Sequence, residues 1–370
     1  MVKYINNLKI VMQSLQDTIN SYGIKRAVKN LRKTPSLLGI DINDQFIVLV
    51  ELDADGQDLT VISYAIKKLP MNAIVNGAIK NPDIVCEQLL SLIEEANTRT
   101  KKVAIAVSGS SVITKTIYMP ANLNDDYLEA KIFADADKYI PYPLDDVSID
   151  FATINTGGNK DSEILLAACR KEMIDERVDI LTKIGLDPVI VDIKIYNIER
   201  AFSLIKKNHA YKSNEIIALF ERNSGLSLTV IKGETAVFHK EGSFVVNDNE
   251  TDRAIDDKVK SAENELLQLV GEDNKNEDKE KIALHIQAAL QFFMSSSQHE
   301  QIDRIILAGN FLSINELSIW LGDWLKIPTS VANPLAHMQV AESVDCHAIN
   351  DNGSLSMVAC GLAMRGLSCQ

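Results

Sequence analysis

The chain has 370 residues, of which 46% are hydrophobic and 24% charged, so it has the composition of a globular protein with material for more than one core. Its formal net charge of −13 means that the molecule as a whole repels nucleic acids and anionic lipids at long range. We therefore expect no nucleic-acid partner.

Residues 1–36 form a basic extension in which seven basic residues face the single acid Asp17. Apolar residues recur there at three- and four-residue steps, which predicts an amphipathic helix: Ile5, Leu8, Met12, Leu15 and Ile19. Such a helix packs on its own protein, or it contacts a membrane surface or a membrane-bound partner. Both interpretations of the extension stay open, and the second predicts peripheral membrane association.

No apolar run in the sequence approaches the length of a transmembrane helix, which is about 20 residues. The sequence also shows no signal-peptide core followed by small residues. Its five cysteines lack the paired spacing of zinc sites or of a disulfide framework, which suits a reducing compartment. These features predict a cytoplasmic protein without a transmembrane segment and without a bound metal.

After the extension, the pattern of apolar residues predicts three strands, a helix and a further strand. Their ranges are 37–41, 46–52, 59–67, 82–97 and 103–109. The same order begins again further on, with strands at 215–221, 226–232 and 235–241, helices near 253–270 and 279–296, and a strand at 303–309. We interpret this repetition as an internal duplication of one supersecondary unit.

Between the two copies lies an alternating α/β segment, which we interpret as a small inserted subdomain. Its predicted elements are a helix at 125–139, strands at 147–155 and 163–169 around a Gly157-Gly158 loop, a helix at 171–184 and a strand at 188–194. The predicted domains are therefore the extension 1–36, a first half 37–115 completed by 336–370, the insertion 116–195, and a second half 196–335.

Five stretches resemble the PilM family of actin-like type IV pilus assembly proteins, which is related to FtsA. They are ADADKYIPYPLDDVSIDF (134–151), EILLAACRKEMIDERV (163–178), LQFFMSSSQHEQIDRIILAG (290–309), VANPLAHM (331–338) and SMVACGLAMRG (356–366). The resemblance implies an α/β, actin-like (ribonuclease H-like) duplicated fold, with a small inserted α/β subdomain of the FtsA type. Residues 1–36 lie outside the resemblance.

The resemblance also implies a role and a cofactor. PilM-like proteins bind the cytoplasmic tail of the inner-membrane protein PilN at the inner face of that membrane, and they connect it to other pilus assembly proteins. Members of the family typically bind ATP with Mg²⁺. The resemblance thus predicts a scaffold function, and the alternative is an active ATP-binding protein, either an ATPase or a small-molecule kinase.

In an actin-type fold, each half offers a hairpin turn whose backbone amides approach the phosphates. Gly39 and Asp41 match the family at the first turn, where Asp41 is suited to hold a Mg²⁺-bound water. The glycine and serines expected next are replaced by Asn43, Asp44 and Gln45. Asp44 places a negative charge beside the expected polyphosphate, at a cost of roughly 1 to 4 kcal/mol.

The corresponding elements of the second half also depart from the family pattern. Glu221 stands where backbone should approach phosphate, and the expected glycine pair reads Gly309-Asn310, followed by the bulky Phe311. The predicted cofactor-binding set consists of Gly39, Asp41, Asn43, Asp44, Gln45, Gly309 and Asn310. The changes predict a degenerate nucleotide cleft with weak or absent ATP binding, and no other catalytic set is recognisable.

We predict that the partner tail binds in a groove between the insertion and the first half. The candidate residues are Tyr139, Pro141, Tyr142, Pro143 and Leu144, because prolines stiffen the backbone that presents two aromatic rings. Nearby acids, Asp145, Asp146 and Asp150, favour a tail with lysine or arginine. The alternative is that the tyrosines only close the subdomain against its neighbour.

Overall fold

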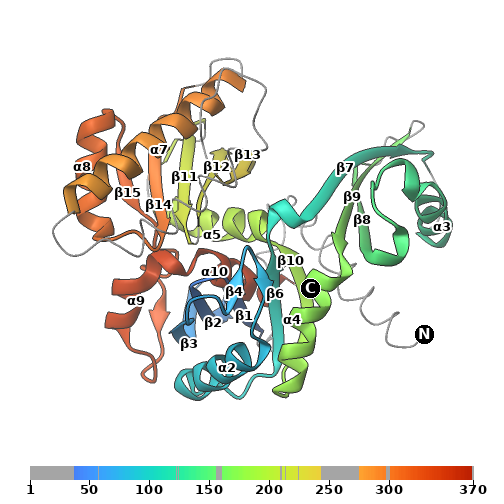
Figure 1. The fold of residues 1–370 in the computed structure, drawn as a ribbon, viewed down its shortest axis with the longest axis horizontal. Coiled ribbons are helices and arrows are strands. Elements are labelled where there is room, and N and C mark those ends of the chain that lie inside the picture. The colour runs from blue at the N-terminus through green and yellow to red at the C-terminus, as the bar shows by residue number, and fades with distance from the viewer. Residues whose placement is uncertain are drawn as a thin grey trace. The chain divides into compact units, whose positions relative to one another are not determined.

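The computed structural model describes residues 37–56, 58–121, 123, 125–155, 161–208, 211–212, 214–223, 225–242, 275–296 and 301–368. These residues form two compact units: one contains the described residues up to 208 and from Asn333 onwards, and the other contains those from Tyr211 to Ala332 (Figure 1). Three predictions lie outside the described residues: the helix in 1–36, the glycine loop at 157–158 and the helix near 253–270.

The first unit is built on a six-stranded sheet in the order β10-β6-β1-β2-β3-β16. Its antiparallel meander consists of β1 (Leu38–Ile42), β2 (Phe46–Asp55) and β3 (Asp58–Lys68). The strands that join it in parallel are β6 (Lys102–Val107), β10 (Asp187–Ile193) and the short β16 (Gln339–Val340). Every residue of β1 is buried, as expected for a central strand covered on both faces.

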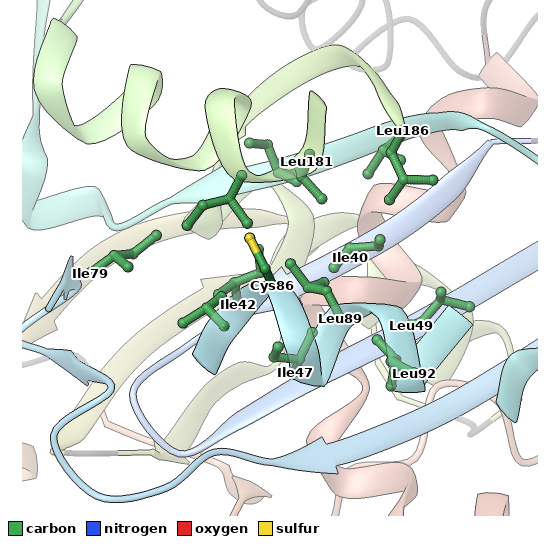
Figure 2. Close-up of a cluster of buried hydrophobic side chains, with 14 of the residues drawn as sticks. Ile40, Ile42, Ile47, Leu49, Ile79, Cys86, Leu89, Leu92, Leu181 and Leu186 are labelled. Atoms are coloured by element: carbon green, nitrogen blue, oxygen red, sulfur yellow. The ribbon is translucent and has the colours of Figure 1, made fainter. Parts of the chain in front are cut away.

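One face of this sheet packs on α2 (Pro82–Ala96) and α4 (Lys171–Lys183) through an apolar core (Figure 2). Helix α2 begins where Oδ1 of Asn81 accepts a hydrogen bond from the amide of Ile84 at 3.3 Å, with Pro82 in the first turn. The core residues labelled in Figure 2 are Ile40, Ile42, Ile47, Leu49, Ile79, Cys86, Leu89, Leu92, Leu181 and Leu186. Ile79 belongs to a small hairpin of β4 (Ile74–Val75) and β5 (Ala78–Ile79).

This unit also contains α5 (Lys194–Asn208), α9 (Cys346–Asn352), α10 (Met357–Ala363) and α11 (Arg365–Ser368). The predicted boundary at residue 196 places most of α5 in the second half, whereas in the structure α5 lies in the first unit. Arg200 of α5 donates to the carbonyl of Gly361 in α10 at 2.8 Å and pairs with buried Asp192 of β10 at 3.2 Å. These long-range contacts attach α5 to the first unit.

The inserted module is a three-stranded antiparallel sheet with α3 (Asp125–Asp135) on one face (Figure 1). Its order is β7-β9-β8, with β7 (Val112–Met119), β8 (Val147–Asn155) and β9 (Ser162–Arg170). The predicted range 116–195 is wider, because it includes α4 and β10. The structure places these two elements with the six-stranded sheet, since β10 pairs with β6 and α4 packs on the core of Figure 2.

The second unit has a five-stranded sheet in the order β13-β12-β11-β14-β15. Its elements are β11 (Ile216–Arg222), β12 (Leu226–Lys232), β13 (Thr235–Glu241), α7 (Lys275–Ser296), β14 (Arg304–Gly309), α8 (Ile314–Leu325) and β15 (Thr329–Val331). Each unit thus has a meander of three antiparallel strands followed by two parallel strands, which is the predicted duplication. Within the described chain, no helix is long and apolar enough to cross a membrane.

Candidate functional site

The turn between β1 and β2 closes around the side chain of Asn43. Its Oδ1 accepts hydrogen bonds from the backbone amides of Gln45 at 3.0 Å and Phe46 at 2.9 Å. Its Nδ2 donates to Oδ2 of the buried Asp41 at 3.1 Å. The turn therefore brings together four predicted residues: Asp41, Asn43, Asp44 and Gln45. Two backbone amides that would serve a phosphate, those of Gln45 and Phe46, are already bonded within the turn.

The carboxylate of Asp44 caps the hairpin between β4 and β5. It accepts hydrogen bonds from the backbone amides of Asn76 and Gly77, each at 3.0 Å. These two residues have φ of 50° and 76°, the left-handed conformations that a tight hairpin turn requires. Asn-Gly is the strongest short sequence signal for such a turn, so the hairpin is recognisable in the sequence, whereas its contact with Asp44 is not.

Arg177 of α4 fixes the same hairpin from the other side. Its Nη2 donates to the carbonyl of Gly77 at 2.7 Å and its Nη1 to the carbonyl of Met173 at 3.0 Å, while the side chain is buried. Burial lowers the pKa of the Arg177 guanidinium, and the charges of nearby carboxylates, Glu176 first, oppose that shift. Asp44 is among these carboxylates. The β1–β2 turn is thus connected through the hairpin to α4.

Gly39, predicted to approach a phosphate, lies where α10 packs against β1. A Cβ atom at this position would lie 2.1 Å from the carbonyl oxygen of Ala359 and 2.5 Å from the nitrogen of Ala363. Both distances are far below van der Waals contact. The packing of α10 on β1 therefore requires glycine here, whether or not a nucleotide binds.

Gly309 and Asn310 belong to the second unit, where they join the ends of β14 and β11. Gly309 has a φ of +87°, and a Cβ atom there would lie 2.2 Å from the carbonyl oxygen of Arg222. That same oxygen accepts a hydrogen bond from the amide of Asn310 at 2.6 Å. Phe311 packs into the core of this unit and Glu221 is buried. The close approach of the Arg222 backbone accounts for glycine at position 309. Core packing accounts for Phe311.

The predicted partner-binding segment divides into buried and exposed positions. Tyr139 and Leu144 are half-buried and pack on the core of the inserted module, whereas Pro141, Tyr142 and Pro143 are exposed. The guanidinium of Arg170 lies 4.9 Å from the centre of the Tyr142 ring, within the range of a cation–π interaction. The next residue, Lys171 at the start of α4, donates from Nζ to the carbonyl of Asp145 at 2.5 Å.

A small apolar cluster, which we name the seam, joins the module to β10 and α5. Its buried members are Ala152, Ala167 and Ile193, with Val112, Leu165, Ile195 and Tyr196 packed against them. It lies on the face of the module sheet opposite α3, because strand residues alternate and their neighbours Ile117, Ile149, Leu166 and Ala168 form the α3-facing core. In the sequence, these seam residues carry no signal that distinguishes them from ordinary core positions.

Residues 39–367 match the model of the family described as type IV pilus assembly protein PilM. Among solved structures, the chain is similar to one described as the PilM-PilN type IV pilus biogenesis complex, with a TM-score of 0.66 and 20% identity over 91% of this chain and 99% of that one. It also matches the ethanolamine utilization protein EutJ from Carboxydothermus hydrogenoformans, with a TM-score of 0.44 and 12% identity over 97% and 98% of the two chains.

A third solved structure is a Bacteroides thetaiotaomicron protein of unknown function with an actin-like ATPase fold, with a TM-score of 0.41 and 8% identity over 82% and 92% of the two chains. The shared strand order of the two units and the likeness to the first of these structures confirm the predicted fold class. The chain has an α/β, actin-like duplicated fold with a small inserted subdomain.

Proposed function

The chain belongs to the PilM family of type IV pilus assembly proteins, and we propose that within that machinery it is a scaffold that binds the cytoplasmic tail of an inner-membrane PilN-like protein. The complex to which the chain is structurally similar contains PilN, which supports a partner of that kind. In this proposal the protein works in the cytoplasm at the inner face of the inner membrane and contacts other pilus assembly proteins as well.

The observation that carries the proposal is the way the inserted module is mounted on the first unit. The module has its own core, yet it meets β10 and α5 through the small seam and meets α4 through Lys171, which donates to the carbonyl of Asp145. Exposed Tyr142 lies beside this contact, with the guanidinium of Arg170 at 4.9 Å from the centre of its ring. Rigid aromatic side chains of this kind lose little entropy when a peptide packs on them.

Charge favours a cationic tail at this junction. Asp145 and Asp146 are exposed and follow the tyrosine segment directly. Asp150 was expected to contribute to the same surface, but it is fully buried and its Oδ1 accepts a hydrogen bond from the backbone amide of Phe151 at 2.8 Å. The two exposed carboxylates would therefore steer the lysine or arginine side chains of the tail.

We assign the nucleotide a minor place in this function. The amides of Gln45 and Phe46 are bonded to Asn43, and the Asp44 carboxylate serves the hairpin amides, so this turn offers an incoming phosphate few donors. The residues present thus fit a bound ATP poorly. In this proposal the scaffold acts through its partner surface and does not depend on nucleotide turnover.

Co-purification from cells tests the proposal. The tagged chain should recover a PilN-like membrane protein after detergent extraction, and a variant in which Asp145 and Asp146 are both changed to lysine should recover less of it. A matched control changes Asp53 and Asp55, at the far end of β2, to lysine. Tail binding at this surface would be contradicted if no such membrane protein is recovered, or if both variants recover equal amounts of it.

A further inference from the structure

The outer face of α2 is exposed and acidic, with an apolar side chain at its centre. Asp83, Glu87, Leu90 and Glu94 are all exposed and follow one another at three- and four-residue steps, so they form one ridge of the helix. Leu90 retains 47% of its surface. Helix α2 contains no basic residue. A segment that covers this face must therefore combine apolar and basic side chains.

The last turn of α2 has the wrong charge for the end of a helix. Glu94 and Glu95 lie there without a basic residue, whereas the helix dipole favours cations at this end. Glu95 forms an ion pair with Lys67 of β3. Among the described residues, Glu87 and Glu94 have no ion-pair partner. A cation beside Glu94 would satisfy both the carboxylate and the helix end.

The basic extension, residues 1–36, joins the described chain next to this end of α2. Leu38 pairs with Glu51 in the ladder of β1 and β2. The two carboxylate oxygens of Glu51 accept hydrogen bonds from the hydroxyl groups of Thr98 at 2.7 Å and Thr100 at 2.6 Å. Thr98 lies two residues after the last residue of α2, Ala96. The extension is therefore tethered beside Glu94.

The helices on the two faces of the six-stranded sheet differ in charge. Helices α2 and α4 contain eight acidic and three basic residues, whereas α5, α10 and α11 contain one acidic and five basic residues. Helix α10 packs on the opposite face at Gly39, and it contacts α5 and α11. A basic segment that begins at this edge of the sheet is thus attracted to the α2 face and repelled from the other.

The extension has the composition that the α2 face requires. It contains seven basic residues and one acid, and five of the bases lie within 25–33, close to the tether. The apolar stripe predicted from Ile5 to Ile19 covers fifteen residues, which is also the length of α2. Residues 20–36 can span about 55 Å when extended, more than the about 22 Å length of α2, so the stripe can reach Leu90.

We propose that residues 1–36 dock on the outer face of α2, with the basic segment 25–33 beside Glu94 and the apolar stripe over Leu90. Because the extension is tethered beside this face, its effective concentration there is on the order of millimolar, which favours this contact over one with a separate molecule. Residues 37–370 have a net charge of −19 and repel anionic lipid, which opposes a membrane contact. The extension is then an internal cover of the first unit, whichever partner the protein binds.

Hydrogen exchange of the full chain tests the contact. A helix of this length is only marginally stable by itself in water, so protection of its amides requires a docking surface. Amides within 8–19 should exchange at least about tenfold more slowly than their intrinsic rates. Changing both Glu87 and Glu94 to lysine should remove most of this protection. Changing Glu280 and Asp323 to lysine, two exposed acids on α7 and α8, alters the net charge equally and should leave it intact.

A second pair of variants tests the apolar part of the contact. Leu90→Ser should reduce the protection of 8–19 about tenfold, whereas Leu284→Ser, which removes a leucine of similar exposure on α7, should not. The melting temperature by circular dichroism shows whether each variant stays folded.

Carbodiimide coupling of the wild-type chain gives a measurement that needs no variant. This reagent joins carboxylates to neighbouring amines without a spacer, so mass spectrometry should find Glu94 coupled to a lysine within 25–33 of the same molecule. Coupling of these lysines only to acids outside α2 would contradict the contact.

Three results of the exchange experiment would overturn the inference. Amides within 8–19 that exchange at intrinsic rates, or that stay protected in the Glu87 and Glu94 variant, would show that the extension does not dock on α2. Protection that appears only with vesicles of an anionic phospholipid would assign the extension to the membrane surface. Protection that rises with protein concentration would assign it to a second copy of the chain.

Discussion

Nη2 of Arg177 lies 2.7 Å from the carbonyl oxygen of Gly77, and this bond joins α4 to the β4–β5 hairpin across one hundred residues of sequence. The adjoining amide of Gly77 is bonded to Asp44 in the β1–β2 turn. At its N-terminal end, α4 contacts the module through Lys171, which donates to the carbonyl of Asp145 just after the tyrosine segment. One helix therefore contacts both the surface proposed for the partner and the hairpin that holds the phosphate-side turn.

Replacing Arg177 with methionine should destabilise the first unit. The half-buried carbonyl groups of Gly77 and Met173 would each lose a hydrogen-bond donor, and the nearby carboxylates would lose a buried counter-charge, so we expect the free energy of unfolding to fall by about 2–4 kcal/mol in urea titrations. Lys183→Ala on the same helix is the control, because its ion pair with Asp83 is exposed and should contribute nothing measurable. Equal stability of the Arg177 variant and the wild type would contradict this role.

Gly39→Ala separates a packing role from a phosphate-binding role. The new methyl group would overlap the Ala359 carbonyl, so the free energy of unfolding should fall by about 1–3 kcal/mol. Gly225→Ala is the matched control, since a Cβ atom there meets no atom within 4 Å and stability should change by less than about 0.5 kcal/mol. Unchanged stability of the Gly39 variant, together with altered nucleotide binding, would instead support a phosphate contact.

Tyr64 should make stability depend on alkaline pH. Burial raises the pKa of its phenol from the ordinary value of 10.0 to about 12, and a hydrogen bond with Ser356 opposes the shift. The folded state holds the proton more tightly, so this stabilising contribution is complete below pH 10 and is lost between pH 10 and 12. Between pH 10 and 12, the free energy of unfolding should therefore fall by about 2 kcal/mol less for Tyr64→Phe than for the wild type. Parallel stability curves of the two proteins would refute the assignment.

Much of the fold could be predicted because its signals are local. Asn81 and Pro82 mark the start of α2, and the apolar runs at 226–232 and 235–241 coincide with β12 and β13. The limits of the insertion could not be predicted, because only pairing with β6 shows that β10 belongs to the first sheet.

The site was predictable as a set of positions but not as a set of contacts. Asp41 to Gln45 do share one turn, as predicted. The partners that give these residues their roles are distant in sequence: Asp44 bonds to Asn76, and Gly39 packs on Ala359 near the other end of the chain. A family pattern assigns such residues to a ligand, whereas the structure shows contacts within the protein that also account for them.

Tyr142→Ala tests the partner-binding segment. The side chain is 39% exposed, and its ring faces the guanidinium of Arg170 at 4.9 Å, so the variant should keep its fold and melting temperature by circular dichroism. Its affinity for the tail peptide should fall about tenfold, equivalent to ~1.4 kcal/mol, because the exposed ring would lose its contact with the tail. If the variant is instead destabilised and binds the peptide normally after correction for the folded fraction, Tyr142 is structural.

Calorimetric titration of the chain with the tail peptide, in the presence and absence of Mg-ATP, tests the central claim most directly. If the protein is a scaffold with a degenerate nucleotide cleft, the peptide binds with the same affinity under both conditions, and Mg-ATP alone binds with a dissociation constant above roughly 100 µM. Low-micromolar binding of Mg-ATP, or peptide binding that appears only when Mg-ATP is present, would contradict the account.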